Sequence, residues 1–257
     1  LDDLTLRARH TLNTVDLIAA EDTRHSRTLL NHHGITTPLT SLHEHNEQHK
    51  AHSLISQLQQ GRTIALIADA GTPLISDPGQ FLIQAAIDAQ IPVCPLPGPC
   101  AAITALCAAG LATDHFVFEG FLPARSARRK KQLAQRQHET ATLIYYEAKH
   151  RMMAFLSELI DTFGPDRPAV VARELTKQFE SFQRGRLIDL QEHFNTHPDT
   201  LKGEFVVLIQ GQSNDTAIPT PLPAQQVHEL LSTHLPPAKA AALSAKITGG
   251  KKSDFYR

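Results

Sequence analysis

A short apolar segment followed by a loop rich in glycine and proline restricts the fold of this chain most. Residues 63–67 (Thr-Ile-Ala-Leu-Ile) lack helical periodicity and predict a buried strand of a parallel sheet. Residues 68–79 follow with a carboxylate, Asp69, two glycines and two prolines. Such a loop must turn tightly and bring bare backbone close to a partner. Because α/β folds bind ligands at the carboxyl ends of their strands, we expect a ligand site here, although Asp69 could instead only hold the turn.

Strand and helix patterns alternate from residue 1 to about 113, which predicts a doubly wound parallel sheet. The expected strands are 16–20, 63–68 and 91–95, and the expected helices are 23–30, 45–60, 80–89 and 101–109. Residues 4–15 have near-helical spacing with no strand before them, so the fold either begins with a helix or has lost its first strand upstream of Leu1.

Residues 114–211 predict a second α/β domain with a mixed sheet, because several of its strand patterns have hairpin-like spacing. The expected strands are 116–118, 141–147, 169–173, 179–184 and 203–210, and the expected helices are 124–139 and 151–163. Residues 212–222 have the composition of a linker, and 223–257 predict a small helical tail. The predicted domains are therefore 1–113 and 114–211, followed by the linker and the tail.

Composition excludes some classes of function. The 257 residues carry a formal net charge of −1, so a nucleic-acid ligand would have to bind local basic patches. The three cysteines, Cys94, Cys100 and Cys107, lack metal-ligand spacing and predict buried free thiols in a reducing compartment, with no metal site. No apolar run approaches a membrane span and no signal peptide is visible, which favours the cytoplasm.

Three further segments have the composition of a site. Residues 95–102 follow a predicted strand and open a helix, either as a plain helix start or as a ligand loop; they lack dinucleotide and phosphate-loop signatures. In residues 20–25, the acids suit a helix N-terminus, whereas Arg24 could bind phosphate. Residues 146–151 form a similar junction in the second domain, which could equally be a solvated cap.

Several of these segments occur in the order found in one family. Taken together, the chain resembles the tetrapyrrole methylase superfamily, and within it the bacterial enzymes that methylate a cytidine ribose 2′-hydroxyl of 16S ribosomal RNA. The resemblance spans nearly the whole chain. It is carried by Glu21-Asp22-Thr23-Arg24, residues 68–79, residues 96–106, Glu119-Gly120-Phe121-Leu122-Pro123, residues 172–177 and residues 203–209.

The resemblance implies two α/β domains with S-adenosylmethionine in a cleft between them, and a homodimer that acts on the 30S subunit. It implies two cofactor loops and a tyrosine that closes over the adenosine: Asp69, Ala70, Gly71, Thr72, Pro99, Cys100, Ala101 and Tyr146. It also implies a C-terminal appendage ending in the segment Lys251-Lys252-Ser253-Asp254-Phe255-Tyr256. The family begins with a strand and a glycine turn, which would lie upstream of Leu1 in this sequence.

Methyl transfer to a ribose hydroxyl needs alignment and benefits from a general base, but no motif identifies one. Chemistry and family position leave three candidates, Asp22, Glu147 and His150. The expected phosphate-binding side chains are Arg24, Arg151, Arg173 and Lys177, and the basic helix 124–139 either extends that surface or is merely solvated. The alternatives are a methyltransferase of a tetrapyrrole or other small molecule, and a non-enzymatic RNA-binding assembly factor.

Overall fold

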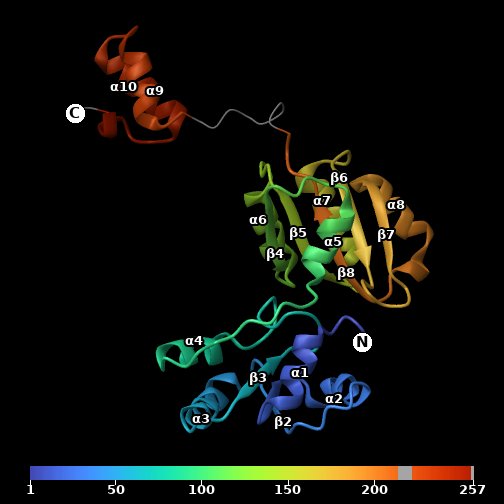
Figure 1. Cartoon of the computed structure of the whole chain (residues 1–257). Coiled ribbons are helices and arrows are strands. Elements are labelled where there is room, and N and C mark those ends of the chain that lie inside the picture. The colour runs from blue at the N-terminus through green and yellow to red at the C-terminus, as the bar shows by residue number, and fades with distance from the viewer. Residues whose placement is uncertain (214–221, 256–257) are drawn as a thin grey trace. The chain divides into compact units, whose positions relative to one another are not determined.

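The computed structural model describes residues 1–213 and 222–255, and these form two compact units, 1–211 and 212–257 (Figure 1). Most of the predicted linker, 214–221, and the terminal Tyr256 lie outside the described residues. None of the described helices is long and apolar enough to cross a membrane.

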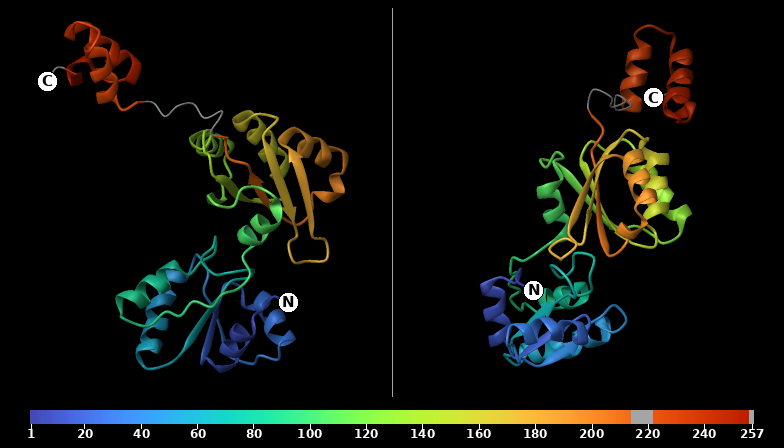
Figure 2. Two further views of the ribbon diagram at one scale, coloured as in Figure 1. Left: turned by 45° about the horizontal axis from the view of Figure 1, so that its top comes forward. Right: turned by 90° about the vertical axis from the view of Figure 1, so that its right-hand side faces the viewer.

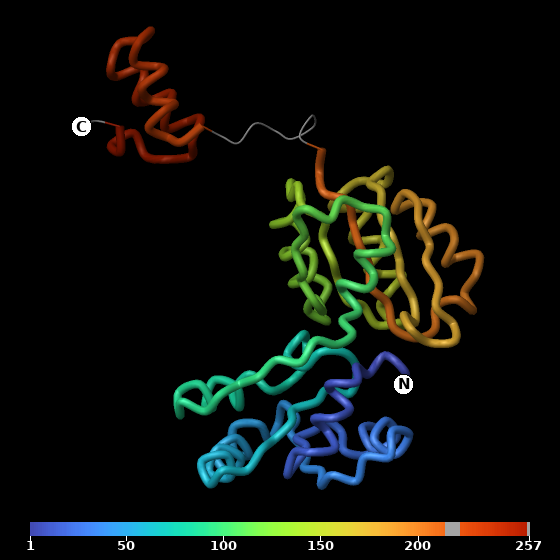
Figure 3. Tube along the Cα trace, in the orientation of Figure 1, coloured from blue at the N-terminus to red at the C-terminus, as the bar shows by residue number. Residues whose placement is uncertain are grey.

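The first sheet is parallel, as predicted. Among the described residues its order is β2-β1-β3, formed by Leu39–Ser41, Leu17–Ala20 and Ile64–Ile67. The chain runs from β1 to β2 on one side and then crosses to β3 on the other, so the connections diverge at the carboxyl ends of β1 and β3 (Figure 3). In open α/β sheets, a crevice forms at this kind of position and binds ligands.

Helices cover both faces of this sheet. Buried leucines of α1 (Leu6–Thr14) and α2 (Thr23–His32) pack with Ile18 on one face. Those of α3 (Glu47–Gln59) and α4 (Gln80–Asp88) pack with Ala19 on the other. The alternation of Ile18 and Ala19 follows from the two-residue period of a strand.

The second sheet is mixed, as predicted, with the order β4-β5-β8-β6-β7. Only β4 and β5 pair in parallel; the other pairings are antiparallel. The strands are Phe116–Phe121 (β4), Thr142–Ala148 (β5), Pro168–Arg173 (β6), Ser181–Arg186 (β7) and Glu204–Ile209 (β8).

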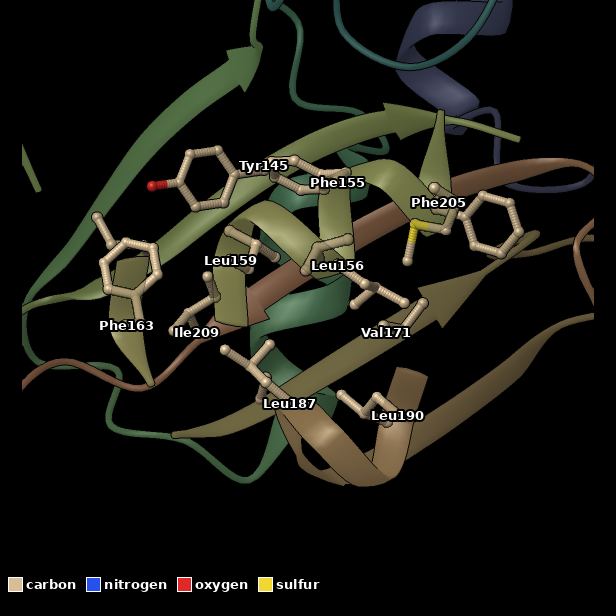
Figure 4. Close-up of a cluster of buried hydrophobic side chains, with 14 of the residues drawn as sticks. Tyr145, Phe155, Leu156, Leu159, Phe163, Val171, Leu187, Leu190, Phe205 and Ile209 are labelled. Atoms are coloured by element: carbon tan, nitrogen blue, oxygen red, sulfur yellow. The ribbon is translucent and has the colours of Figure 1, made fainter. Parts of the chain in front are cut away.

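The largest core lies between one face of this sheet and the helices α6 (Ser126–Gln135), α7 (Met152–Phe163) and α8 (Leu187–Thr196) (Figure 4). Tyr145 points into it and meets Phe155 edge to face, with ring centroids 5.5 Å apart. Helix α5 (Ala101–Ala109) covers the opposite face, which Figure 2 shows in its right-hand view. Helix α5 thus packs on the second sheet, although it lies before residue 113, where the sequence predicts the domain boundary. The boundary itself stays a prediction.

The second unit is a helical hairpin of α9 (Ala224–Ser232) and α10 (Pro237–Thr248), followed by a 3₁₀ turn, η2 (Lys252–Phe255). Val227 of α9 and the small residues Ala240 and Ala241 of α10 are buried. The two helices of the tail are those that the sequence predicted.

Residues 91–95 are not the predicted strand, because they pair with no other strand among the described residues. Pro92 and Pro95 lack an N–H to donate to a ladder, and Pro97 and Pro99 extend the same irregular stretch. The stretch is instead attached by Arg7, whose Nη2 donates to the Pro95 carbonyl at 2.9 Å.

Two predictions of burial were also wrong. The strand β3 forms as expected, but its residues are half-exposed because it pairs only with β1 within the described sheet. The three cysteines are free thiols, but Cys94 and Cys107 are exposed and Cys100 is half-buried. Cys94 lies in the irregular stretch, and Cys107 lies on the solvent side of α5, which buries Ala102, Ala105, Leu106 and Ala109 instead.

Candidate functional site

The loop after β3 and the loop after β1 meet at the divergence point of the first sheet. The carboxylate of Asp69 accepts a hydrogen bond from the backbone N–H of Asp22 at 3.0 Å. In return, Asp69 N–H lies 3.5 Å from Glu21 Oε2. Asp69 therefore joins the loop after β3 to the loop after β1, while its role in ligand binding stays a prediction.

A third carboxylate, that of Asp77, lies near those of Glu21 and Asp69. It comes from the other end of the loop that contains Asp69. Burial, followed by the charges of Glu21 and Asp69, raises the pKa of Asp77 to about 6. Among the described residues, none of these three carboxylates has a salt bridge to a cationic side chain. The site thus gathers negative charge that nothing in this part of the protein neutralises.

The loop between β3 and α4 is strained. Leu74 and Ser76 have φ angles of 71° and 76°, a region that side chains with a Cβ rarely adopt. Gly79 has a φ of 130°, which side chains with a Cβ rarely adopt, and a Cβ built on it would lie 2.7 Å from a methyl carbon of Leu66. Buried Glu47 fixes the end of the loop, because its Oε1 accepts from Gly79 N–H at 2.9 Å and Phe81 N–H at 2.7 Å.

The predicted second cofactor loop contacts the first one directly. The hydroxyl of Thr72 donates to the carbonyl of Pro99 at 2.9 Å. Gly71 has a φ of 77°, a conformation that favours glycine, and a Cβ placed on it would be in ordinary contact with the same carbonyl oxygen at 3.4 Å. The structure therefore brings Gly71 and Thr72 together with the start of α5.

Tyr146 lies on the α5 side of the second sheet. Its hydroxyl oxygen accepts from the N–H of Ala102, in the first turn of α5, at 3.0 Å. The ring meets Phe118 and Phe121 edge to face, with centroids 4.9 and 5.4 Å away. Burial raises the pKa of Tyr146 to about 12, so it remains a neutral hydroxyl.

Phe118 and Phe121 also line a hollow of about 370 Å³ beside Ser76. Gly120 bends β4 at this point with a φ of 62°, and a Cβ there would lie 3.1 Å from Ser76 Oγ. The hollow thus lies between the strained loop and the carboxyl end of β4. Sequence reasoning did not name Ser76, Asp77, Phe118 or Phe121 as site residues. Ser76 and Asp77 lie in the loop 68–79 and Phe121 in the segment 119–123, which the sequence had singled out, whereas no signal marked Phe118.

The three candidate bases have different surroundings. Asp22 caps α2, and the N–H of Arg24, 2.8 Å from its carboxylate, lowers the pKa of Asp22, followed by a weaker bond from His25. Glu147 points to the α7 face of the sheet, opposite Tyr146, is 1% exposed, and accepts from Arg151 Nε at 2.7 Å. His150 is exposed in the turn after β5.

The predicted phosphate-binding residues are not equally available. The Arg24 side chain is 92% exposed and lies 3.6 Å from Asp22. Arg151 is committed to buried Glu147, Arg173 Nε donates to the carbonyl of Lys202 at 2.7 Å, and Lys177 is paired with Glu174 and Glu204.

The basic helix α6 is also partly structural. Arg129 is buried and forms an ion pair with Glu158 at 2.5 Å, and Lys130 and Arg136 pair with carboxylates on α7 and β4. Arg125, Arg128 and Lys131 remain exposed. Three of the six cationic residues in and beside this helix therefore form ion pairs within the fold.

The fold is that of the tetrapyrrole methylases. Residues 1–191 match the family described as tetrapyrrole (corrin/porphyrin) methylases. Residues 219–257 match a second family, described as the RsmI C-terminal HTH domain. Among solved structures, uroporphyrin-III C-methyltransferase from Thermus thermophilus aligns with a TM-score of 0.58 at 20% identity, covering 81% of this chain and 88% of that one. Diphthine synthase aligns with a TM-score of 0.61 at 13% identity, covering 82% of this chain and 86% of that one.

Several curated relatives are much more similar in sequence. Proteins named ribosomal RNA small subunit methyltransferase I are 49% identical in Haemophilus influenzae and 47% identical in Escherichia coli O157:H7. The matches cover all of this chain and 91% and 90% of those proteins. The chain therefore belongs to the ribosomal RNA small subunit methyltransferase I family of tetrapyrrole methylases.

Proposed function

We propose that this protein methylates the 2′-hydroxyl of a cytidine in 16S ribosomal RNA of the small ribosomal subunit, with S-adenosylmethionine as the methyl donor. The observation that carries the proposal is the extent of the similarity to named ribosomal RNA methyltransferases. It includes the C-terminal unit, which lies beyond the 1–191 match to the wider methylase family. The fold alone does not distinguish an RNA from a porphyrin substrate.

The chemistry of the site fits this cofactor. S-adenosylmethionine supplies a methyl group activated by a positively charged sulfonium. The uncompensated carboxylates Glu21, Asp69 and Asp77 offer a negative environment suited to a cation. The glycine at position 71 and the aromatic rings around Tyr146 suit an adenosine pressed against backbone. The residues that would hold it are those of the two loops, Asp69, Ala70, Gly71, Thr72, Pro99, Cys100 and Ala101, together with Tyr146.

Most of the rate would come from alignment and exclusion of water. Two of the three candidate bases are engaged elsewhere. Glu147 lies on the face of the second sheet opposite Tyr146 and is paired with Arg151, and Asp22 caps α2. His150 is the candidate whose side chain stays exposed at the carboxyl end of β5, and histidine is the side chain that most often serves as a general base. We therefore assign the proton acceptor to His150, and phosphate binding first to Arg24.

The test uses tritiated S-adenosylmethionine with 30S subunits, free 16S RNA and a porphyrin precursor. Label is expected in the RNA of the 30S subunits, in a dinucleotide that survives alkaline hydrolysis because the 2′-oxygen is blocked. Subunits that already carry the methyl group serve as the control and should accept none. Label in the porphyrin alone, or no transfer to any of the three, would contradict the proposal.

The family resemblance further supports a homodimer in the cytoplasm. A sedimentation mass near twice the 28.3 kDa of one chain would agree with it. A mass of a single chain at the concentrations used for methyl transfer would count against the dimer without affecting the assignment of the reaction.

A further inference from the structure

We propose that Phe179, in the β6–β7 turn, stacks on a base of the RNA that flanks the methylated nucleotide. The inference rests on the proposed function and adds a residue that recognises the substrate. Phe179 is 62% exposed, more than any other phenylalanine among the described residues.

The turn lies at the edge of the sheet where the site is. β5 is parallel to β4 and antiparallel to β8, and β8 is antiparallel to β6. The carboxyl ends of β4, β5 and β6 therefore share one edge, which brings Phe121, His150 and the 174–180 turn to the same side. Figure 2 shows the β6–β7 turn projecting beyond the sheet in its left-hand view.

The turn is held in a defined conformation. Glu174 and Thr176 have φ angles of 48° and 62°, and the N–H of Thr176 donates to Glu180 Oε2 at 2.6 Å. The backbone of Lys177 bonds to the carbonyl of Glu174 at 3.0 Å, while Leu175 packs into the core beneath α5. A strained, internally bonded turn that keeps an aromatic ring in water is typical of a binding element.

The charges on this edge favour stacking as a source of affinity. Lys177 shares its charge with Glu174 and Glu204, and Lys202 lies 3.2 Å from Asp199. Exposed Lys149 and Arg125 add positive charge at the ends of β5 and β4. Two of these four cations are thus paired with carboxylates, so stacking can add to the phosphate attraction of the other two; proteins that bind single-stranded RNA gain much of their affinity by stacking bases on aromatic rings.

The distance between β6 and β4 indicates that Phe179 stacks on a base next to the target nucleotide and not on the target base itself. Three strand spacings of about 4.8 Å each separate β6 from β4, or about 14 Å in total. That distance exceeds one stacked nucleotide step of about 3.4 Å. With the target ribose at the hollow beside Phe118 and Phe121, Phe179 reaches a different nucleotide of the same strand.

The test is a set of substitutions at Phe179, measured with 30S subunits and with an RNA oligonucleotide of the target sequence. Phe179→Ala is expected to raise the KM for RNA about 5- to 150-fold, since stacking on one base contributes about 1–3 kcal/mol. Its kcat and its affinity for S-adenosylmethionine should stay near those of the original protein. Phe179→Tyr, which keeps the ring, should restore the KM.

The chain contains no tryptophan, so Phe179→Trp introduces a single one, whose emission can be excited apart from that of the tyrosines. Binding of the oligonucleotide should quench its emission by stacking. Phe116→Trp is the matched control, because Phe116 is 42% exposed at the opposite end of β4, and its emission should not change.

Three results would overturn the inference: an unchanged KM for Phe179→Ala, an unquenched Phe179→Trp protein that still binds RNA, or a loss traced by sedimentation to a changed oligomeric state. The last result would make Phe179 part of a contact between two copies. Methyl transfer by the unmodified protein is measured in parallel. Its absence would contradict the proposed function itself, whereas normal transfer with any of the three results would contradict only the role of Phe179.

Discussion

The backbone N–H of Ala102 donates a 3.0 Å hydrogen bond to the hydroxyl oxygen of Tyr146. This bond joins the first turn of α5 to β5 and satisfies one of the N–H groups that a helix leaves free at its start. It also fixes the tyrosine ring against Phe118 and Phe121. The second candidate cofactor loop and the aromatic side of the site are therefore attached to each other.

Tyr146→Phe should remove this bond and keep the ring. We expect the free energy of unfolding to fall by about 1 kcal/mol, and the affinity for S-adenosylmethionine to fall severalfold. Tyr145→Phe is a close control, because the buried Tyr145 hydroxyl has no hydrogen-bond partner in the structure and its loss should be neutral or stabilising. Urea unfolding and titration calorimetry measure both quantities. A larger loss for Tyr145→Phe than for Tyr146→Phe would contradict this account.

Asp69 can be tested for its two roles separately. Asp69→Asn keeps an oxygen that can accept from Asp22 N–H but removes the charge, whereas Asp69→Ala removes both. If the charge binds a cationic cofactor, both variants should lose affinity for S-adenosylmethionine, by about tenfold or more for Asp69→Ala. Only Asp69→Ala should also lose stability, by about 1 kcal/mol. Unchanged affinity in calorimetry for both would remove this loop from the cofactor site.

Asp77 should make stability depend on pH. The pKa of Asp77 is about 6 in the folded protein against 3.8 for an unperturbed aspartate, so the folded state binds more protons between these values. Stability should therefore fall as pH rises from 4 to 6. Asp77→Asn should remove this dependence and raise stability at pH 7.5 by about 1 kcal/mol, after allowing for the solvent screening of a half-buried carboxyl. Parallel pH profiles of the two proteins in urea unfolding would argue against it.

The ionisation of Asp77 that lowers stability should have the opposite effect on the affinity for the cofactor. A cation favours the ionised carboxylates, so the affinity for S-adenosylmethionine should rise as pH increases through about 6. The affinity of the Asp77→Asn protein should be lower and should vary less over this range. Calorimetry at pH 5.5 and 7.5 gives the comparison.

Arg24→Glu should reduce methyl transfer to 30S subunits without changing the affinity for S-adenosylmethionine. The side chain is 92% exposed at the carboxyl end of β1, so its reversal should cost little stability. We expect the KM for subunits to rise about tenfold at low salt and less at high salt, because the interaction is screened. Arg9→Glu, an equally exposed reversal on α1, is the control. Equal effects of the two reversals would indicate a general effect of charge.

The sequence predicted the architecture well because its signals were local. The helix at 101–109 and the end of α2 at Gly34 follow from periodicity and from glycine at a helix stop. The mixed second sheet followed from strand spacing. In contrast, β2 and α8 were not predicted. β2 has only three residues, and α8 begins directly after β7, so no loop composition marks its start in the sequence.

The site was only partly predictable, since its surroundings depend on the packing of distant segments. The two loops were found from their glycines and prolines. The side of the sheet on which Glu147 lies, and its pairing with Arg151, follow from the register of β5 against β8. The proximity of Asp77 to Glu21 and Asp69 depends on how the strained loop returns after β3. Neither relation leaves a local pattern in the sequence.

The irregular stretch from residue 91 to 99 has a consequence for the energy of ligand binding. Four of its nine residues are prolines, whose φ angles are nearly fixed, so it behaves as a semi-rigid spacer between the end of α4, the helix that follows the loop after β3, and the start of α5. Such a spacer limits how far the two loops can separate in the absence of ligand. It thereby raises the effective concentration of one loop at the other, and a ligand that contacts both loses less conformational entropy on binding.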